Sequence, residues 1–295
     1  MGFLRDYGPQ LAGASVALGL AGAFLYANRR RVPIAVDWTR KGMFVERSWF
    51  DKIAAPAFEF RRLGIEWLII ETSIQSHKID KSKWVTRTGD TFAEIEKKIN
   101  PPDAPYRIEL WAWGWPIPEY AAMFAAHVID VLESPFVAGY VLDIEAKSWS
   151  TKMNSQMQMD LAAHSLIGTI RNKSKKKLLL SSHGRADFAP LPWNALRTLD
   201  GGLPQCYDAS NKYGDGFIGR CIDSYRKMGF SFVSPTLSGT KYTSAARMHE
   251  MLSVMPKVST VNWWTWTSIG QTEEKKEVVR NFSLTGEQIA ERIKR

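Results

Sequence analysis

Residues that build disulfide frameworks and metal sites are scarce in this sequence. Its 295 residues include only two cysteines, Cys206 and Cys221, and five histidines. The cysteines form neither a Cys-x-x-Cys pair nor a zinc pattern, and no two histidines stand at the spacing of metal ligands. We therefore expect no metal and no cofactor, and we favour two free buried thiols over a disulfide.

A glycine-rich phosphate loop, an internal repeat and a low-complexity linker are also absent from the sequence. The missing loop disfavours a doubly wound sheet of the nucleotide-binding kind, which stays an alternative fold. Hydrophobic residues make up 45% of the chain and aromatic residues 12%. This composition supports a substantial core, and a single α/β barrel would use roughly 250 residues.

The charge balance is basic, with a formal net charge of +9 and an isoelectric point of about 9.5. Such a surface suits an anionic partner (nucleic acid, anionic lipid or an acidic cell-wall polymer), and it is equally compatible with a generally basic, soluble surface. The basic run at 171–177 contains no aromatic residue. We therefore interpret it as a solvated loop and expect no nucleic-acid binding.

A long apolar run lies near the N-terminus. Residues 11–27 are all apolar or small, and an asparagine and three arginines follow at once. The run is at the lower edge of the roughly 17–25 residues that span a bilayer. Residues 1–31 are therefore predicted to be a single-pass membrane anchor, in a cell envelope or a virion membrane. A cleavable signal peptide, which fits the late arginines less well, and a buried apolar helix are the alternatives.

Two features of this predicted anchor bear on assembly and topology. Small residues recur at Ser15, Gly19 and Ala23, a spacing that lets two such helices approach closely and form a homo-oligomer. The arginines at 29–31 predict that the large domain stays on the cytoplasmic side. That topology conflicts with a role in degrading cell walls, so the sequence leaves the orientation open.

After the anchor, apolar β-rich runs alternate with amphipathic segments. The eight predicted strands lie at 34–38, 67–73, 107–115, 138–146, 177–183, 203–207, 230–237 and 260–266. Such alternation implies parallel strands joined by right-handed crossovers. The simplest arrangement is an α/β fold of the TIM type, a (β/α)8 barrel over residues 32–272. Residues 273–295 are predicted to form a charged helical tail.

The fourth predicted strand ends with two acids on one face. Residues i and i+2 of a strand point the same way, so Asp143 and Glu145 project side by side among apolar neighbours. Two carboxyl groups in such surroundings cannot both ionise cheaply, so one is expected to keep its proton near neutral pH. Cleavage of a glycosidic bond requires such a pair. The structural alternative is a pair satisfied by backbone N–H groups or by Lys147.

Acids and aromatic residues also gather at the other predicted strand ends, where the active sites of such barrels lie. Tryptophan faces stack on the apolar faces of sugar rings, so this composition favours a carbohydrate ligand. We expect Trp67 and Trp111 to fill the core and His183 to form a hydrogen-bonded pocket wall. The residues expected to contact substrate are Trp38, Glu71, Trp113, Gln205, Tyr207, Asp208 and Trp266.

The motifs resemble those of the family 25 glycoside hydrolases, the lysozyme-type muramidases of bacteria and phages. The resemblance rests on Val36-Asp37, on the segment 142–145 (Leu-Asp-Ile-Glu) and, more loosely, on the segment 264–268. It implies a peptidoglycan strand or a related acetamido-sugar glycan as substrate and Glu145 as general acid. Asp143 would orient or stabilise the 2-acetamido group of the substrate, and Asp37 would assist.

A second, weaker similarity is to the family 18 chitinase-type barrels. The Asp143-x-Glu145 motif matches the end of their acidic motif, and Tyr207-Asp208 resembles their Tyr-Asp pair on the sixth strand. The two earlier aspartates of that acidic motif are absent. Tyr207 would then assist in stabilising the reacting sugar.

The sequence thus predicts a membrane-anchored hydrolase of the peptidoglycan glycan strand, from a bacterium or a phage. The alternative is a barrel that binds glycan without cutting it, as a structural part of a virion or a cell envelope. This alternative is motivated by the lack of a clear equivalent for the further aspartate that family 25 enzymes carry near strand eight. A basic nucleic-acid binder is the third interpretation.

Overall fold

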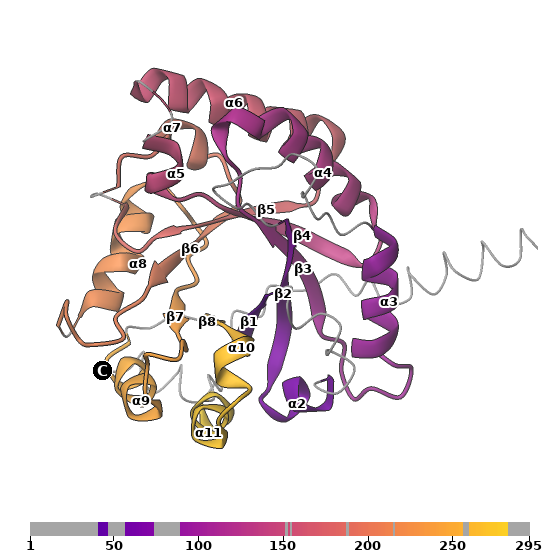
Figure 1. Ribbon diagram of the computed structural model, residues 1–295, viewed down its shortest axis with the longest axis vertical. Helices are drawn as coiled ribbons and strands as arrows, with labels where there is room; N and C mark the ends of the chain where they lie inside the picture. Colours follow the sequence, from indigo (N-terminus) through magenta and orange to yellow (C-terminus); the bar gives the residue numbers. More distant parts are fainter. Residues whose placement is uncertain are drawn as a thin grey trace, which may run out of the picture. The chain divides into compact units, whose positions relative to one another are not determined.

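The computed structural model describes residues 41–46, 57–73, 89–150, 153, 155–186, 189–214, 216–255 and 260–282, all within the compact unit Trp38–Arg295. Eight parallel strands close into one barrel in sequence order (Figure 1). The strands β1 to β8 are Lys41–Val45, Ile65–Ser73, Glu109–Gly114, Val137–Asp143, Lys177–His183, Gly201–Cys206, Thr236–Ser238 and Val261–Trp264. The predicted TIM-type barrel is confirmed.

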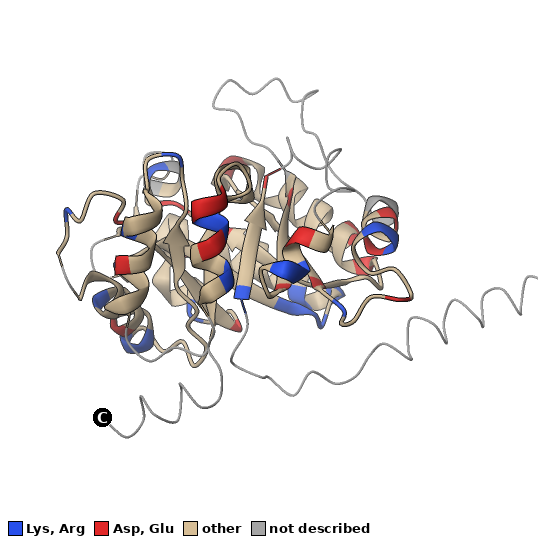
Figure 2. Ribbon diagram, turned by 90° about the horizontal axis from the view of Figure 1, so that it is seen from below, with Lys and Arg blue, Asp and Glu red and all other residues tan. Residues whose placement is uncertain are grey.

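Helices lie between the strands along the chain and surround the barrel (Figure 1). The longer ones are α2 (Ala57–Arg62), α3 (Gly89–Ile99), α4 (Ala121–Glu133), α6 (Gln156–Lys173), α8 (Phe217–Lys227), α9 (Ala245–Ser253) and α11 (Glu273–Asn281). The short ones are η3 (Pro118–Tyr120), α5 (Ala146–Ser150), α7 (Trp193–Leu196) and α10 (Trp266–Ile269). Charged side chains are spread over these helices and the loops (Figure 2).

Local sequence signals explain where two of the helices begin. Ser155 caps α6 by accepting a hydrogen bond from the backbone N–H of Gln158 at 3.2 Å, and Ser244 caps α9 through the N–H of Arg247 at 3.1 Å. Serine favours these positions because its hydroxyl satisfies an N–H that the helix leaves without a partner. The caps therefore fix where the chain turns from a loop into each crossover helix.

Alternation along the strands produces two separate cores. Outward residues pack against the helices, and inward residues fill the barrel. The interior cluster consists of Phe44, Trp67, Ile69, Trp111, Trp113, Val141, Leu179 and Leu203. Because tryptophan rings occupy so much of the interior, the neighbouring strands need glycine. A Cβ on Gly139 would stand 2.3 Å from the Trp111 ring, and one on Gly42 would stand 2.3 Å from Trp67 Nε1. The prediction that Trp67 and Trp111 fill the core is confirmed.

The first barrel strand lies later than the sequence pattern indicated. The strand between β2 and β8 is Lys41–Val45, whereas the sequence pattern predicted it at 34–38. That predicted segment, which includes Asp37 and Trp38, lies outside the described residues. The sequence pattern missed this strand because it begins with Lys41, and a charged residue is not expected at a buried position. The ammonium group of Lys41 is nevertheless buried at the start of β1. Lys41 Nζ donates to the carbonyls of Leu63 at 3.1 Å and Val279 at 2.7 Å, and burial lowers its pKa to about 8.

The segment 273–295, predicted to be a charged tail, begins with α11. Val279 on this helix is fully buried, and the carbonyl that it presents to Lys41 ties the helix to β1. The first part of the segment is therefore packed onto the barrel, and residues 283–295 lie outside the described part. The predicted anchor, 11–27, also lies outside it. Among the described residues, no helix has the length and apolar character needed to cross a bilayer.

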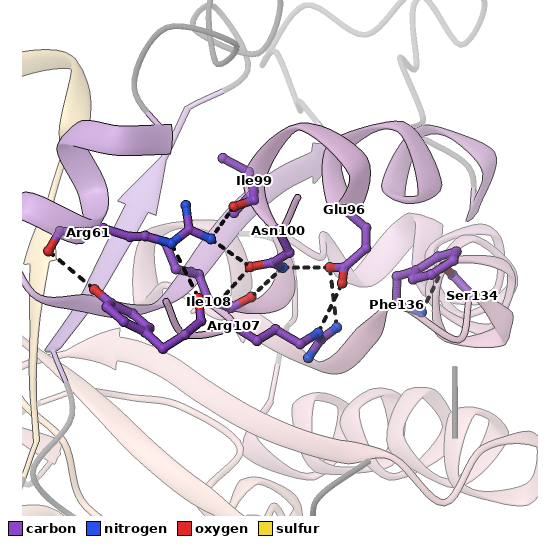
Figure 3. Close-up of polar contacts among 9 residues, drawn as sticks. Arg61, Glu96, Ile99, Asn100, Arg107, Ile108, Ser134 and Phe136 are labelled. Carbon is purple, nitrogen blue, oxygen red and sulfur yellow. Dashed lines mark hydrogen bonds and ion pairs between the residues drawn. The ribbon is translucent and has the colours of Figure 1, made fainter. Parts of the chain in front are cut away.

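A buried polar cluster joins α2, the end of α3 and the segment before β3 (Figure 3). The side chain of Asn100 accepts from the backbone N–H of Ile108 at 2.7 Å, donates to the carbonyl of Ile108 at 2.9 Å and donates to Glu96 at 2.7 Å. Arg61 and Arg107 close the cluster from either side, at 3.2 Å to Asn100 and 3.0 Å to Glu96. The cluster lies at the amino ends of the strands, the end that stabilises such barrels.

Candidate active site

Asp143 and Glu145 lie at the carboxyl end of β4, Asp143 as its last residue and Glu145 two positions beyond it. Val141 belongs to the interior cluster, whereas Leu142 and Ile144 belong to the outer core. Since side chains alternate along a strand, Asp143 shares the inward side with Val141, and the charge of Glu145 acts on its carboxyl group. Glu145 is half-buried, whereas Asp143 is only 5% exposed. A molecule at the barrel mouth therefore reaches Glu145 more readily than Asp143.

Asp143 is held by side chains from the next two strands. Gln205 Nε2 on β6 donates to Asp143 Oδ1 at 2.8 Å, and the same nitrogen lies 3.2 Å from Ser181 Oγ on β5. Burial, together with the negative charges of Glu145 and Glu71, raises the pKa of Asp143 to about 8, and the hydrogen bonds from Ser181 and Gln205 oppose this rise. The carboxyl group of Asp143 therefore keeps its proton at neutral pH.

Three aromatic side chains at the carboxyl ends of β3, β6 and β8 lie close to one another. Trp113, which is 5% exposed, meets the half-buried Trp264 edge-on with the ring centroids 5.2 Å apart. Trp264 also lies 6.4 Å from the ring of Tyr207. Burial raises the pKa of Tyr207 well above its ordinary value, with a further contribution from the charges of Asp143 and Glu145. Tyr207 is therefore a neutral phenol beside the acids, able to donate a hydrogen bond.

Two residues that the sequence analysis assigned to substrate contact are placed elsewhere. Trp266 is the first residue of α10, is 3% exposed and packs on Phe60 of α2 with the centroids 4.6 Å apart. Asp208 is 2% exposed, forms an ion pair with Arg247 at 3.1 Å and accepts the backbone N–H of Lys212 at 2.7 Å. Asp208 therefore fastens the loop after β6 to α9, and neither side chain is open to a substrate.

Two residues near the mouth were missed by the sequence analysis. Trp264 faces inward because its neighbour Trp263 belongs to the outer core, and alternation along β8 was the signal that could have selected it. The peptide bond that follows Trp264 is cis. Glu46 comes directly after β1 and accepts a hydrogen bond from Thr267. It was overlooked because the first strand was expected at 34–38.

Both cysteines and His183 lie in the part of the chain that the structure describes. Cys206 and Cys221 are both buried and free, as predicted, and burial raises the pKa of Cys206 well above its ordinary value. His183 lies at the end of β5, where its ring accepts the backbone N–H of Arg185 at 3.2 Å. Within the described part of the chain, no group of three or more acids, histidines and cysteines is placed to hold a metal ion.

Comparison with known proteins identifies the fold and not a family. No protein-family model matches the chain, and no curated protein sequence matches it. Among solved structures, the GH18 chitinase from the chitin utilization locus of Flavobacterium johnsoniae has a TM-score of 0.58 at 12% identity, over 83% of this chain and 93% of that one.

Two further structures show the same likeness. The PgaB (BpsB) glycoside hydrolase domain of Bordetella bronchiseptica has a TM-score of 0.58 at 6% identity, over 84% of this chain and 99% of its own. An endo-β-N-acetylglucosaminidase from Cordyceps militaris has a TM-score of 0.52 at 12% identity, over 82% and 90%. At such low identity the likeness concerns the fold alone: this chain is similar in architecture to the barrels of glycoside hydrolases.

Proposed function

We propose that this protein hydrolyses glycosidic bonds in an acetamido-sugar glycan, and that the glycan strand of peptidoglycan is its substrate. The observation that carries the proposal is the state of Asp143, a buried carboxyl group whose pKa is raised to about 8 beside the more accessible Glu145. Two neighbouring carboxyl groups that hold one proton between them supply both the acid and the base of glycoside cleavage.

The positions of the two acids suggest their roles. Glu145, the member that a substrate reaches, would protonate the leaving oxygen while the acetamido oxygen of the substrate attacks the anomeric carbon. Asp143, having passed the shared proton to Glu145, would accept a hydrogen bond from the acetamido N–H, and the phenol of Tyr207 would donate one to the acetamido oxygen. Water would then open the cyclic intermediate, with Glu145 taking up the proton. A positioned acid of this kind contributes about 10²–10⁴-fold to the rate.

Other residues of the mouth would bind the sugars. Trp264 and the edge of Trp113 offer apolar faces, and the half-buried Glu71 at the end of β2 would accept hydrogen bonds from sugar hydroxyls. Asp37 and Trp38 lie outside the described residues, and we retain their proposed roles as an assisting acid and a sugar contact. We also retain the proposal that residues 11–27 anchor the protein in a membrane.

The solved neighbours support the substrate class by analogy. They include chitinases and endo-β-N-acetylglucosaminidases. One structure of the Cordyceps militaris enzyme is a double variant in which an aspartate and a glutamate two positions apart are replaced, in complex with fucosyl-N-acetylglucosamine-Asn. Asp143 and Glu145 have the same spacing, which favours a comparable role for the pair.

The test is the release of reducing ends from purified peptidoglycan and from chitin oligosaccharides. Glu145→Gln should lower the rate by at least about 100-fold because the general acid is lost. Glu133→Gln, the same change at an exposed position on α4, is the matched control and should keep the wild-type rate. Unchanged cleavage by the Glu145 variant would remove this residue from the mechanism. A wild-type protein that binds both glycans but releases no reducing ends would be the non-catalytic glycan-binding barrel.

A further inference from the structure

A pocket of about 300 Å³ is lined by residues from the carboxyl ends of β5 and β6 and the start of α8, elements that Figure 1 labels. Gln205 and Tyr207 belong to its lining, and the amide of Gln205 also donates to Asp143. The pocket therefore adjoins the candidate active site through Gln205. Its volume is at the lower end of the range for small-molecule sites, about 300–1,000 Å³, and suits a single sugar unit.

Guanidinium groups line part of this pocket. Arg185 and Arg220 contribute two guanidinium groups, and no carboxylate is present among the described residues that line it. Arg220 is fixed at the pocket wall because its Nη2 donates to the carbonyl of Tyr213 at 2.7 Å. A guanidinium group has a planar set of donors that fits the two oxygens of a carboxylate.

The remaining wall of the pocket is aromatic. Tyr213 and Phe217 stack with their centroids 4.6 Å apart and an interplanar angle of 23°, and Tyr213 is 49% exposed. Lys212 lies over the ring of Tyr213 at 5.6 Å, which adds a third cation at the rim. An exposed aromatic ring beside clustered cations can hold the apolar face of a sugar and an acidic group on that sugar together.

From this combination we propose that the pocket between β5, β6 and α8 binds a carboxylate-bearing sugar of the glycan whose neighbouring unit lies at the acid pair. The inference rests on the proposed function, since it places the two sugars in one chain. It adds that the protein prefers a glycan that carries a carboxylate, and that Arg185 and Arg220 recognise this group.

The experiment measures binding to a pair of ligands that differ only in charge. The first ligand is an oligosaccharide of the peptidoglycan strand freed of its peptides, which carries free lactyl carboxylates, and the second is the same material after reduction of its carboxyl groups to alcohols. The full-length protein carries Glu145→Gln so that neither ligand is consumed, and titration calorimetry gives both dissociation constants. We expect the carboxylate ligand to bind at least about 10-fold more tightly, as charge-assisted hydrogen bonds to arginine imply.

Substitutions of the two arginines then test whether the preference for the carboxylate ligand comes from this pocket. Arg185→Gln and Arg220→Gln should each reduce the ratio of dissociation constants to below about 3-fold. Arg226→Gln is the matched control, because Arg226 is an exposed residue of the same helix that pairs with Asp223 at 3.7 Å outside the pocket. It removes the same charge from the protein and should leave the ratio unchanged. Circular dichroism and thermal unfolding verify that each variant is folded.

The outcomes separate this inference from the proposed hydrolysis. Equal binding of the two ligands, no binding of either, or a preference that survives both pocket variants would overturn the inference, even if the wild-type protein cleaves glycan. A preference that depends on Arg185 and Arg220 supports the pocket assignment, even if the wild-type protein releases no reducing ends and the proposed hydrolysis fails.

Discussion

The side-chain amide of Gln205 donates a hydrogen bond of 2.8 Å to Oδ1 of Asp143, linking β6 to β4 across the end of β5. A protonated carboxyl group still offers a carbonyl oxygen as acceptor, so this bond persists when Asp143 is neutral. Ser181, at 3.2 Å from the same amide nitrogen, joins the strand between them. The side chains of Gln205 and Ser181 therefore hold the acid in one orientation, which is the condition for a carboxyl group to act on a bound substrate.

The raised pKa of Asp143 predicts that this residue destabilises the folded protein at neutral pH. Its pKa is about 8 in the native state and about 4 in an unfolded chain. The native state therefore binds more protons between pH 4 and pH 8, and the free energy of unfolding falls as the pH rises through that window. Asp143→Asn removes this cost and keeps an oxygen that can accept from Gln205.

We expect Asp143→Asn to be more stable than the wild-type protein by about 1 kcal/mol or more at pH 8, with the difference vanishing toward pH 4. Urea unfolding at pH 4, 6 and 8 measures it. Asp103→Asn, in the exposed turn after α3, is the control and should show no such trend. A variant that is less stable than the wild-type protein at pH 8 would show that Asp143 is ionised in the fold. The same variant should lose most of its glycan cleavage.

Much of the barrel could be predicted because strand signals are local. β5, Lys177–His183, has the predicted bounds, since a continuous apolar run follows a basic loop. β7 is different: it has only three residues, Thr236–Ser238, where 230–237 was predicted. Phe230 is buried in the outer core, so its apolar character reflects packing against helices. Periodicity alone cannot distinguish a barrel strand from an apolar segment that leads into one.

The site could be predicted only where its residues are close along the chain. Asp143 ends β4 and Glu145 follows two positions later, so the pattern of the predicted strand 138–146 was enough to select them together. Asp208 was misassigned because its partner, Arg247, lies 39 positions further along the chain, and no local pattern indicates such an ion pair. The contacts of Gln205 and the arginine-lined pocket likewise depend on how strands and a helix meet in space.

Trp264 and Trp266 provide a direct test of how the end of β8 is built. Trp266 lies in the outer core against Phe60, so Trp266→Leu should lower the free energy of unfolding by about 2–4 kcal/mol and leave KM unchanged. Trp264 faces the mouth beside Tyr207, so Trp264→Leu should raise KM about 10-fold, equivalent to about 1.4 kcal/mol, with a smaller loss of stability. Urea unfolding and steady-state kinetics on chitin oligosaccharides measure both variants. The opposite pattern would place Trp266 at the substrate.

Replacing Asn100 should lower the stability of the fold without lowering the rate of catalysis. Its side chain bridges the backbone of Ile108 and the carboxylate of Glu96 at the amino ends of the strands (Figure 3). Asn100→Ala would remove this partner from the N–H and the carbonyl of Ile108, whereas Glu96 keeps Arg107, and each buried group that loses its partner costs about 1–3 kcal/mol. We expect the free energy of unfolding to fall by about 3 kcal/mol, measured in urea. The rate constant kcat should stay at the wild-type value, because the acids lie at the opposite ends of the strands.

The control for this variant is Asn172→Ala, an exposed position near the end of α6. It should change the free energy of unfolding by no more than about 0.5 kcal/mol, because no buried group loses a partner. A comparable loss in both variants would mean that the cost comes from helix ends in general. A fall in kcat for Asn100→Ala at unchanged stability would mean that the amino ends of the strands contribute to the site, which the separation of the two ends argues against.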